Sequence, residues 1–314
     1  MGGYMLYFIV NEKSKSGNAK QIWKEIEEVL KVRNVSYQAF VSEYRGHAGK
    51  LAAEICAMDD NDICLVAVGG DGTANEVING ITDFEKVCFG VIPTGSGNDL
   101  ARGLSLSKDP KNGAIHILNA MKKSREDTWC MDLGEVNFGE KKRLFAISAG
   151  IGLDALVCKK ALKSTIKDIL NKIRLGKLTY LVLTVQSLFT MQTADAEIFF
   201  DREEGLQKKR MIFTAAMNFK AEGGGVPMAP AASACDGKLS FCEAAGIPKW
   251  RTFLCLPFLV AAKHTSIHGF SVTDAKDCTI RLSRPMVVHA DGEYCGEVTE
   301  VHFHCLPGEL RVLK

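Results

Sequence analysis

A chain of 314 residues, of which 46% are hydrophobic and 24% charged, has the composition of a soluble globular protein and the length of about two domains. Its formal net charge of +2 excludes a general attraction to nucleic acid, so an anionic partner must meet a local patch. Eleven cysteines, an odd number without a CxxC pair, favour free thiols in a reducing cytoplasm over disulfides or a zinc site.

The sequence contains no signal-peptide pattern and no apolar run long enough to span a membrane. We therefore expect a cytoplasmic protein whose contact with a membrane is peripheral, at the inner face.

The first third of the chain alternates short apolar runs with segments of helical periodicity. Strands that alternate with helices indicate a parallel sheet covered on both faces, so residues 1–131 are predicted to form an α/β domain. The expected strands are 5–10, 35–41, 62–68 and 87–92, and the expected helical segments are 19–30, 48–55, 74–81 and 99–103.

From about Asp132 onward, short β-rich stretches dominate and are separated by Gly, Pro and Asp turns. This pattern predicts an antiparallel β-sandwich over residues 132–306, interrupted by helical segments near 155–189 and 250–263. The β-rich stretches are 143–148, 196–200, 211–217, 239–244, 278–282 and 298–305.

A glycine-rich turn, Gly69-Gly70-Asp71-Gly72-Thr73, lies between an expected strand and an expected helix. Glycines adopt a positive φ at little cost and let backbone N–H groups close on an anion, and the helix directs its positive end to the same place. We expect Thr73 to cap that helix, with Glu76 completing a capping box. A carboxylate beside a phosphate calls for a cation between them, so Asp71 indicates Mg²⁺. The alternative is a tight turn with a capping threonine.

A second turn, Pro93-Thr94-Gly95-Ser96-Gly97-Asn98-Asp99, follows the next strand and also leads into a helix. Two such turns on neighbouring strands line one crevice at the carboxyl ends of the strands, where open α/β sheets bind ligands. The loop at 14–17 is expected at the same edge, with Lys13 and Lys15 available for phosphates. Neither turn fits GxxxxGK[ST], and Leu100 breaks GxGxxG, so a Walker A protein and a Rossmann dehydrogenase are disfavoured.

These two turns, followed by Asn75-Glu76 and by Leu100-Ala101-Arg102, closely resemble the diacylglycerol kinase catalytic-domain family. That family includes bacterial diacylglycerol kinases, related bacterial lipid kinases and sphingosine kinases. Further matches follow in order at 148–155, Asn218, Gly223-Gly224-Gly225, Pro230, Asp236-Gly237-Lys238-Leu239 and Asp291-Gly292-Glu293.

The resemblance implies an ATP-dependent and Mg²⁺-dependent kinase acting on diacylglycerol or a related lipid. It implies a nucleotide-binding α/β domain, a β-sandwich substrate domain and an active site in the cleft between them. It also implies that the C-terminal strand, about 307–314, returns to the first domain. A homodimer is left open.

The resemblance also implies roles for individual residues. The general base would be Asp291 with Glu293, and Asp71 is counted with them as catalytic. A structural Mg²⁺ would use Asp236 with Ser233 and Lys238. The nucleotide would be held by Asn11, Ser42, Gly69, Gly70, Asp71, Gly72, Thr73, Ala74, Asn75 and Ser96.

Four positions depart from the family pattern. Ser42 and Ser96 each replace a common Thr and keep the hydroxyl. Glu12 stands where the family often has Pro, and Cys235 stands where many members have a second acid beside Asp236. Asp291-Gly292 is also a strong hairpin signal, so the alternative for this motif is a turn without a chemical role.

Residues 159–177 hold seven cations against one acid, Asp168, and their apolar residues recur at helical spacing. A basic amphipathic helix suits an anionic membrane surface. Equally open is a surface helix whose apolar side packs on the sandwich and whose lysines are solvated. The cations are Lys159, Lys160, Lys163, Lys167, Lys172, Arg174 and Lys177.

Two competing functions remain. NAD kinases share the first turn, but the glycine triplet at Gly223 and the late Asp291-Gly292-Glu293 favour the lipid branch. A nucleotide-sensing, membrane-binding protein without catalysis would be expected to have lost Asp71, Asp291 or Glu293, and all three are present.

Overall fold

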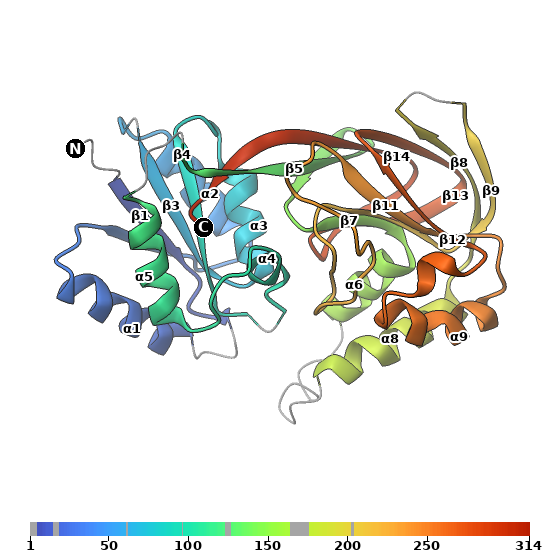
Figure 1. Ribbon diagram of the computed structural model, residues 1–314, viewed down its shortest axis with the longest axis horizontal. Helices are drawn as coiled ribbons and strands as arrows, with labels where there is room; N and C mark the ends of the chain where they lie inside the picture. The colour runs from blue at the N-terminus through green and yellow to red at the C-terminus, as the bar shows by residue number, and fades with distance from the viewer. Residues whose placement is uncertain are drawn as a thin grey trace. The chain divides into compact units, whose positions relative to one another are not determined.

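The chain folds into two compact units, seen in a computed structural model that describes residues 5–14, 19–60, 62–95, 97–122, 127–163, 176–201 and 204–314. Unit 1 comprises Met1–Asp132 with Gly308–Lys314, and unit 2 comprises Leu133–Pro307 (Figure 1). The predicted fold class, an α/β domain and an antiparallel β-sandwich, is confirmed.

Unit 1 is built on a parallel sheet with the strand order β2-β1-β3-β4-β14. Every residue of β3 and β4 is buried, as expected for apolar strands covered on both faces. The last residues of the long strand β14 pair in parallel with β4, through Arg311 and Val312. The strands are β1 (Met5–Val10), β2 (Gln38–Val41), β3 (Ile63–Gly69), β4 (Val87–Pro93) and β14 (Glu293–Val312).

The helices of unit 1 cover its sheet because alternate strand residues point to opposite faces. Leu6, Phe8 and Val10 of β1 share one hydrophobic cluster with residues of α1 and α5, which also contact each other. On the other side, α2 packs against α3. The helices are α1 (Ala19–Val32), α2 (His47–Cys56), α3 (Asp71–Gly80), α4 (Asp99–Gly103) and α5 (Pro110–Ala120).

Unit 2 is an antiparallel sandwich, in which β12-β11-β10-β7-β13-β14 form the main path. The pair β8–β9 continues from β13, and β5–β6 continues from β14. The strands are β5 (Trp129–Phe138), β6 (Lys141–Phe145), β7 (Ser148–Gly152), β8 (Ala194–Phe200), β9 (Leu206–Met211), β10 (Phe213–Met217), β11 (Leu239–Ala244), β12 (Phe270–Ala275) and β13 (Asp277–Ala290).

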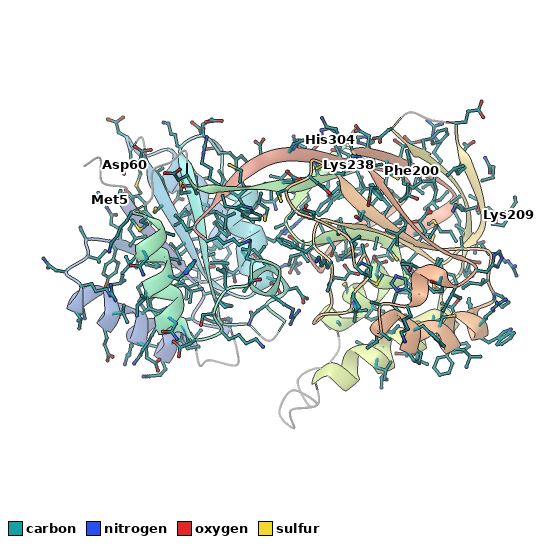
Figure 2. The ribbon with its side chains drawn as sticks, viewed as in Figure 1. Met5, Asp60, Phe200, Lys209, Lys238 and His304 are labelled. Carbon is teal, nitrogen blue, oxygen red and sulfur yellow. The ribbon has the colours of Figure 1, made fainter. Side chains whose placement is uncertain are left out.

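The sandwich core is aromatic at its centre. The ring of Phe200 lies 5.4 Å from that of Phe241, which in turn lies 5.9 Å from Phe303, whereas Lys209 on β9 points outward (Figure 2). In the part of the chain that the structure describes, three α-helices accompany the sandwich: α6 (Leu153–Lys163), α8 (Gly176–Thr190) and α9 (Lys249–Val260). Within the described residues, no helix is both long and apolar enough to cross a membrane.

Two expected strands are divided in the structure. The stretch 143–148 splits into β6 and β7 because the N–H groups of Ala146, Ile147 and Ser148 bond to a side chain, the carboxylate of Asp291, instead of to a strand. The stretch 211–217 splits into β9 and β10. Of the expected basic helix at 159–177, residues 164–175 lie outside the described residues.

Candidate functional site

The carboxyl ends of three neighbouring strands of unit 1 lie side by side. Val10 pairs with Val68, and Gly69 pairs with Pro93. The residues that follow β1 and β4 stay hydrogen-bonded to the end of β3, because Asn11 N donates to Val68 O and Thr94 N donates to Gly69 O. The first loop and both glycine-rich turns therefore begin at one edge of the sheet.

Side chains join these three segments to one another. Asn11 Nδ2 donates to Thr73 Oγ1 at 3.0 Å, and Asn11 Oδ1 accepts the N–H of Lys13 at 3.1 Å. The hydroxyls of Ser14 and Thr94 lie 2.5 Å apart. The structure thus brings Asn11 and Thr73 together, as their shared assignment to a nucleotide site requires.

The prediction that Thr73 caps the following helix is wrong. Helix α3 begins two residues earlier, at Asp71, with Gly70 as its N-cap and no side-chain cap. Thr73 therefore lies inside the first turn, and Glu76 accepts the N–H of Gly46 at 2.8 Å instead of completing a capping box.

The glycines of the first turn do not serve a positive φ, which Gly69, Gly70 and Gly72 do not adopt. A Cβ on Gly69 would lie 2.5 Å from Cβ of Thr73 in the same turn, so glycine there leaves room for the Thr73 side chain. A Cβ on Gly95 would lie 2.7 Å from Cα of Gly70, so the two turns pack backbone to backbone and a side chain at Gly95 would separate them.

Asp71 connects the two turns. Its carboxylate accepts the N–H of Asp99 at 3.0 Å through Oδ2 and the N–H of Leu100 at 3.1 Å through Oδ1. The side chain that was predicted to face a metal ion thus fixes the start of α4 by direct hydrogen bonds, although the two segments are far apart in the sequence. The sequence did not reveal this contact, because it joins residues 28 and 29 positions apart.

The remaining residues assigned to the nucleotide are close to this edge but have mainly structural contacts. Ser42 is buried directly after β2, and its N–H donates to Val10 O. Ala74 and Asn75 are buried in α3, and the amide of Asn79 donates to the carbonyl of Asn75. Ser96 and Lys15 lie outside the described residues, and Lys13 donates to the carbonyl of Glu43.

In unit 2, Asp291 and Gly292 form the two-residue turn that joins β13 to β14. Both have a positive φ, 48° and 81°, as a type I′ hairpin turn requires. Ala290 pairs with Glu293 across the turn. The hairpin interpretation of this motif is therefore correct as a description of the backbone, and it leaves a chemical role open.

The carboxylate of Asp291 anchors the loop between β6 and β7. Oδ2 accepts the N–H of Ala146 at 2.8 Å, and Oδ1 accepts those of Ile147 and Ser148 at 2.8 and 3.0 Å. Three N–H donors favour the negative charge of the carboxylate and fix its orientation. Any proton that Asp291 accepts in a reaction must bind beside these donors.

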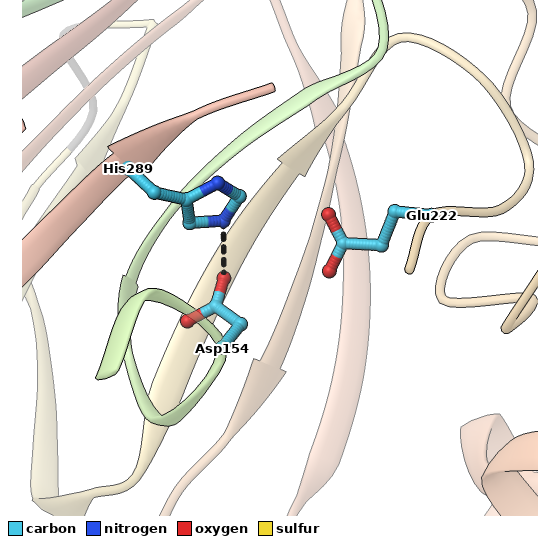
Figure 3. A group of neighbouring side chains, drawn as sticks. All are labelled: Asp154, Glu222 and His289. Atoms are coloured by element: carbon cyan, nitrogen blue, oxygen red, sulfur yellow. Dashed lines mark hydrogen bonds and ion pairs between the residues drawn. The ribbon is translucent and has the colours of Figure 1, made fainter. Parts of the chain in front are cut away.

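A cluster that the sequence did not reveal lies next to this turn (Figure 3). His289 Nε2 lies 3.1 Å from Asp154 Oδ2, and candidate ligand atoms of Asp154, Glu222 and His289 lie within 4.8 Å of one another. Ser148 donates its hydroxyl proton to Glu222. The available signal was a single histidine in the apolar run of residues 286–290, which indicates a buried polar group with a partner.

The tautomer of His289 decides what this cluster can do. Its Nδ1 accepts the N–H of Gly292 at 3.2 Å, so in the neutral ring the proton lies on Nε2 and is donated to Asp154. A metal ion on Nε2 would need that proton moved to Nδ1, against the N–H of Gly292. The geometry therefore favours a hydrogen-bonded chain from Asp154 through His289 to the turn.

Opposing effects act on the protonation of His289. Burial by itself lowers the pKa, but the hydrogen bond and negative charge of Asp154 raise it, and so do the carboxylates of Glu222 and Asp291. The net pKa of His289 is raised from 6.5. Protonation would place an N–H on Nδ1 opposite the N–H of Gly292, so the charge of this ring is coupled to the turn.

Glu222 is carried by a loop that depends on glycine. Gly223, Gly224 and Gly225 have φ values of 59°, 87° and 101°, a left-handed run that side chains rarely adopt. The N–H of Val226 returns to the carbonyl of Glu222 at 2.8 Å. The triplet matched to the family thus turns the chain tightly behind Glu222.

The loop assigned to a structural Mg²⁺ is exposed at Asp236 and Lys238, the latter just before β11 (Figure 2). Asp236 Oδ1 accepts the N–H of Lys238 at 3.1 Å, and the hydroxyl of Ser233 lies 3.5 Å from Cys235 Sγ. A carboxylate with backbone carbonyls is a hard oxygen donor set of the kind that Mg²⁺ prefers. The metal assignment stays a prediction.

Comparison with known proteins matches both parts of the chain. The model of the diacylglycerol kinase catalytic domain matches residues 5–131, and that of the YegS C-terminal NAD kinase beta sandwich-like domain matches residues 148–314.

Individual relatives cover nearly the whole chain. A protein of Bacillus subtilis (strain 168) named "Putative lipid kinase YtlR" is 30% identical over 311 residues, 98% of each chain. A diacylglycerol kinase of the same strain is 28% identical over 264 residues, 82% of this chain and 77% of its own. In fold, a diacylglycerol kinase from Bacillus anthracis str. Sterne gives a TM-score of 0.72 at 18% identity, covering 100% of this chain and 97% of that chain. The chain belongs to the diacylglycerol kinase catalytic-domain family.

Proposed function

We propose that this protein is an ATP-dependent lipid kinase that phosphorylates a hydroxyl of diacylglycerol or a related lipid. The observation that carries the proposal is the start of α3, where the N-cap is Gly70 and offers no side chain to the helix, next to a second glycine turn packed on it backbone to backbone. The first N–H groups of a helix have no partner within the helix, so an anion suits them as a cap. The phosphates of ATP would supply that anion.

The residues of unit 1 divide the work of holding ATP. Asn11 and Thr73 bond to each other at the strand ends, and in this proposal they would contact the phosphates. Asp71 keeps the second turn in place through the N–H groups of Asp99 and Leu100. Mg²⁺ bound with the nucleotide would neutralise phosphate charge, and the carboxylate of Asp71 would interact with that Mg²⁺. A second, structural Mg²⁺ would be held by Asp236 with the carbonyls of Ser233 and Lys238.

The chemical step moves one proton and one phosphoryl group. The acceptor hydroxyl gives its proton to Asp291, its oxygen forms a bond to the γ-phosphorus, and the bond from that phosphorus to ADP breaks. Glu293 shares the base role or orients Asp291. The hydrogen bonds from Ala146, Ile147 and Ser148 keep the Asp291 carboxylate in one orientation throughout.

The substrate class also suggests where the protein acts. Diacylglycerol resides in a bilayer, so the enzyme would work in the cytoplasm, peripheral to the inner face of the membrane. A homodimer and any nucleic-acid partner have no part in this mechanism.

A transfer assay tests the function. Purified protein is incubated with Mg²⁺ and γ-labelled ATP in mixed micelles of diacylglycerol, monoacylglycerol or sphingosine, with NAD as a separate acceptor. We expect label in a lipid phosphate. Label in NADP would establish an NAD kinase, and ATP binding without transfer to any acceptor would establish a nucleotide sensor.

A further inference from the structure

Two adjacent helices of unit 2 expose large apolar side chains that a surface helix normally hides. On α9, Trp250 is 60% exposed, Leu254 56% and Phe258 49%. Their spacing places them on one face of the helix, while Thr252, Cys255 and Leu259 are buried on the other. A helix that is apolar on both faces is typical of a segment in contact with more than water.

Helix α8 extends the same surface. Leu181, Val182 and Phe189 are each about half exposed and lie on one face, since seven or eight residues separate the first two from the third. The ring of Phe189 lies 6.1 Å from that of Phe253 on α9. Lys249 fastens the two helices by donating to the carbonyls of Phe189 and Met191. Figure 1 shows α8 and α9 side by side at the lower edge of the sandwich. We call this surface the α8–α9 face.

The charged residues of α8, α9 and the sequence segments that adjoin these helices have one sign. No Asp or Glu occurs from residue 169 to 194 or from 245 to 273. Arg251 and Lys263 are both exposed at or beside α9. An apolar face with aromatic side chains, on helices that carry cations and no acids, complements an anionic bilayer, where rings enter the interface and cations meet phosphates.

We infer that the α8–α9 face is the surface by which this protein docks on an anionic phospholipid bilayer. The biological reason for docking rests on the proposed lipid kinase activity, because the lipid substrate resides in such a bilayer. Docking itself needs neither ATP nor transfer. It differs from membrane contact through residues 159–177, which was predicted from their excess of cations and the helical spacing of their apolar residues.

Vesicle binding tests the inference without catalysis. Full-length protein is sedimented with vesicles of phosphatidylglycerol and phosphatidylcholine, in the absence of ATP. Because burying one large apolar side chain changes a partition constant by about tenfold or more, the triple variant Trp250→Gln, Leu254→Gln, Phe258→Gln should bind at least about tenfold more weakly. The matched control Val32→Gln, Leu206→Gln removes exposed apolar side chains elsewhere and should bind like the wild type.

Two further experiments test separately the electrostatic contact with the bilayer and the insertion of Trp250 into it. Arg251→Glu with Lys263→Glu should reduce binding to anionic vesicles and remove its salt dependence. Quenching of tryptophan fluorescence by brominated lipids should occur in the wild type and be lost in Trp250→Phe, which keeps an apolar ring and still binds. Equal vesicle binding by the triple variant, or quenching unchanged in Trp250→Phe, would overturn the inference.

Other occupants of the face give different results. If wild-type protein is a dimer in lipid-free buffer and the triple variant is a monomer, a second copy covers the face and the inference fails. An activity comparison keeps the outcome separate from the proposed function: the triple variant should lose turnover of long-chain diacylglycerol in vesicles but keep turnover of water-soluble dihexanoylglycerol. Loss of turnover of both substrates in the triple variant would contradict docking. If the wild type turns over neither substrate but still binds vesicles, only the proposed kinase activity is contradicted.

Discussion

At the scale of single residues, two of the carboxylates assigned to catalysis, Asp291 and Asp71, accept hydrogen bonds from backbone N–H groups. Asp291 accepts three such donors and Asp71 accepts two. A substitution at either position therefore has a structural cost together with any catalytic one. Variants must be chosen so that the two effects can be measured apart.

We predict that Asp291→Asn lowers turnover by about 10²- to 10⁴-fold, the usual contribution of a general base. The amide also turns an N–H group toward a backbone donor, so the free energy of unfolding should fall by about 1–3 kcal/mol. Urea unfolding and steady-state kinetics measure the two effects. Glu300→Gln, an exposed change on β14, is the control and should alter neither. Wild-type turnover in Asp291→Asn would remove it from the mechanism.

His289 predicts a pH dependence of stability whose sign follows from its raised pKa. A group whose pKa is higher in the folded than in the unfolded protein stabilises the fold below the unfolded value, here 6.5, and loses that contribution as pH rises through the folded value. In His289→Asn, the side-chain oxygen can still accept the N–H of Gly292 but cannot titrate. The stability of the wild type relative to His289→Asn should therefore decrease as pH increases above 6.5.

Urea unfolding at a series of pH values from about 5.5 to about 9 measures this difference. The exposed substitution His268→Asn is the control and should follow the wild type. A constant difference between His289→Asn and the wild type across the series would show that His289 does not change its charge on folding.

At the scale of elements, the start of α4 depends on α3 through Asp71, whereas the start of α5 is capped locally by Asp109, which accepts the N–H of Asn112 at 2.9 Å. We predict that Asp71→Ala and Asp109→Ala each lower the free energy of unfolding by about 1 kcal/mol, the usual cost of a lost cap. Only Asp71→Ala should also weaken ATP binding, because the turn before α4 loses its anchor. Calorimetric titration with ATP measures this, and equal affinity in both variants would refute it.

Element by element, the sequence predicts what local patterns determine. Met5–Val10 is a continuous apolar run and forms β1 over those residues, and the alternation of strands with helices correctly indicates a parallel sheet. Helix α5 was missed although Asp109-Pro110 is a good helix start. Strand β13 was predicted only in part, because Pro285 interrupts its pattern.

Contacts between distant segments explain most of what the sequence could not predict at the site. Asp154, Glu222 and His289 come from three separate elements, and no spacing rule joins them. The error at Thr73 has a local cause: the helix starts at Asp71, so the residue expected as a cap is already helical and bonds to Asn11. The assigned catalytic and metal residues stay predictions.

At the scale of the whole molecule, unit 1 depends on the last seven residues of the chain. Leu310, Val312 and Leu313 are buried there, and Arg311 donates to the carbonyls of Phe84 and Glu85. Burial of three such side chains is worth roughly 5–9 kcal/mol, comparable with the entire stability of a typical domain.

We predict that truncation after Pro307 unfolds unit 1 and abolishes ATP binding, while unit 2 keeps a cooperative melting transition. Limited proteolysis and thermal unfolding followed by circular dichroism would show this. Removal of Lys314 alone, whose side chain is exposed, is the control. Retention of ATP binding after the longer truncation would mean that β4 tolerates being an edge strand.

The pairing of β14 with β4 also bears on the order in which the protein is made. Domains usually fold in the order of synthesis, the N-terminal one first. Here the sheet of unit 1 lacks one of its strands until residues 308–314 have been synthesised, whereas every residue of unit 2 precedes them in the chain. A nascent chain that ends before residue 308 therefore presents β4 as an unpaired edge, and the sheet of unit 1 is completed only after the last residue of unit 2 has been made.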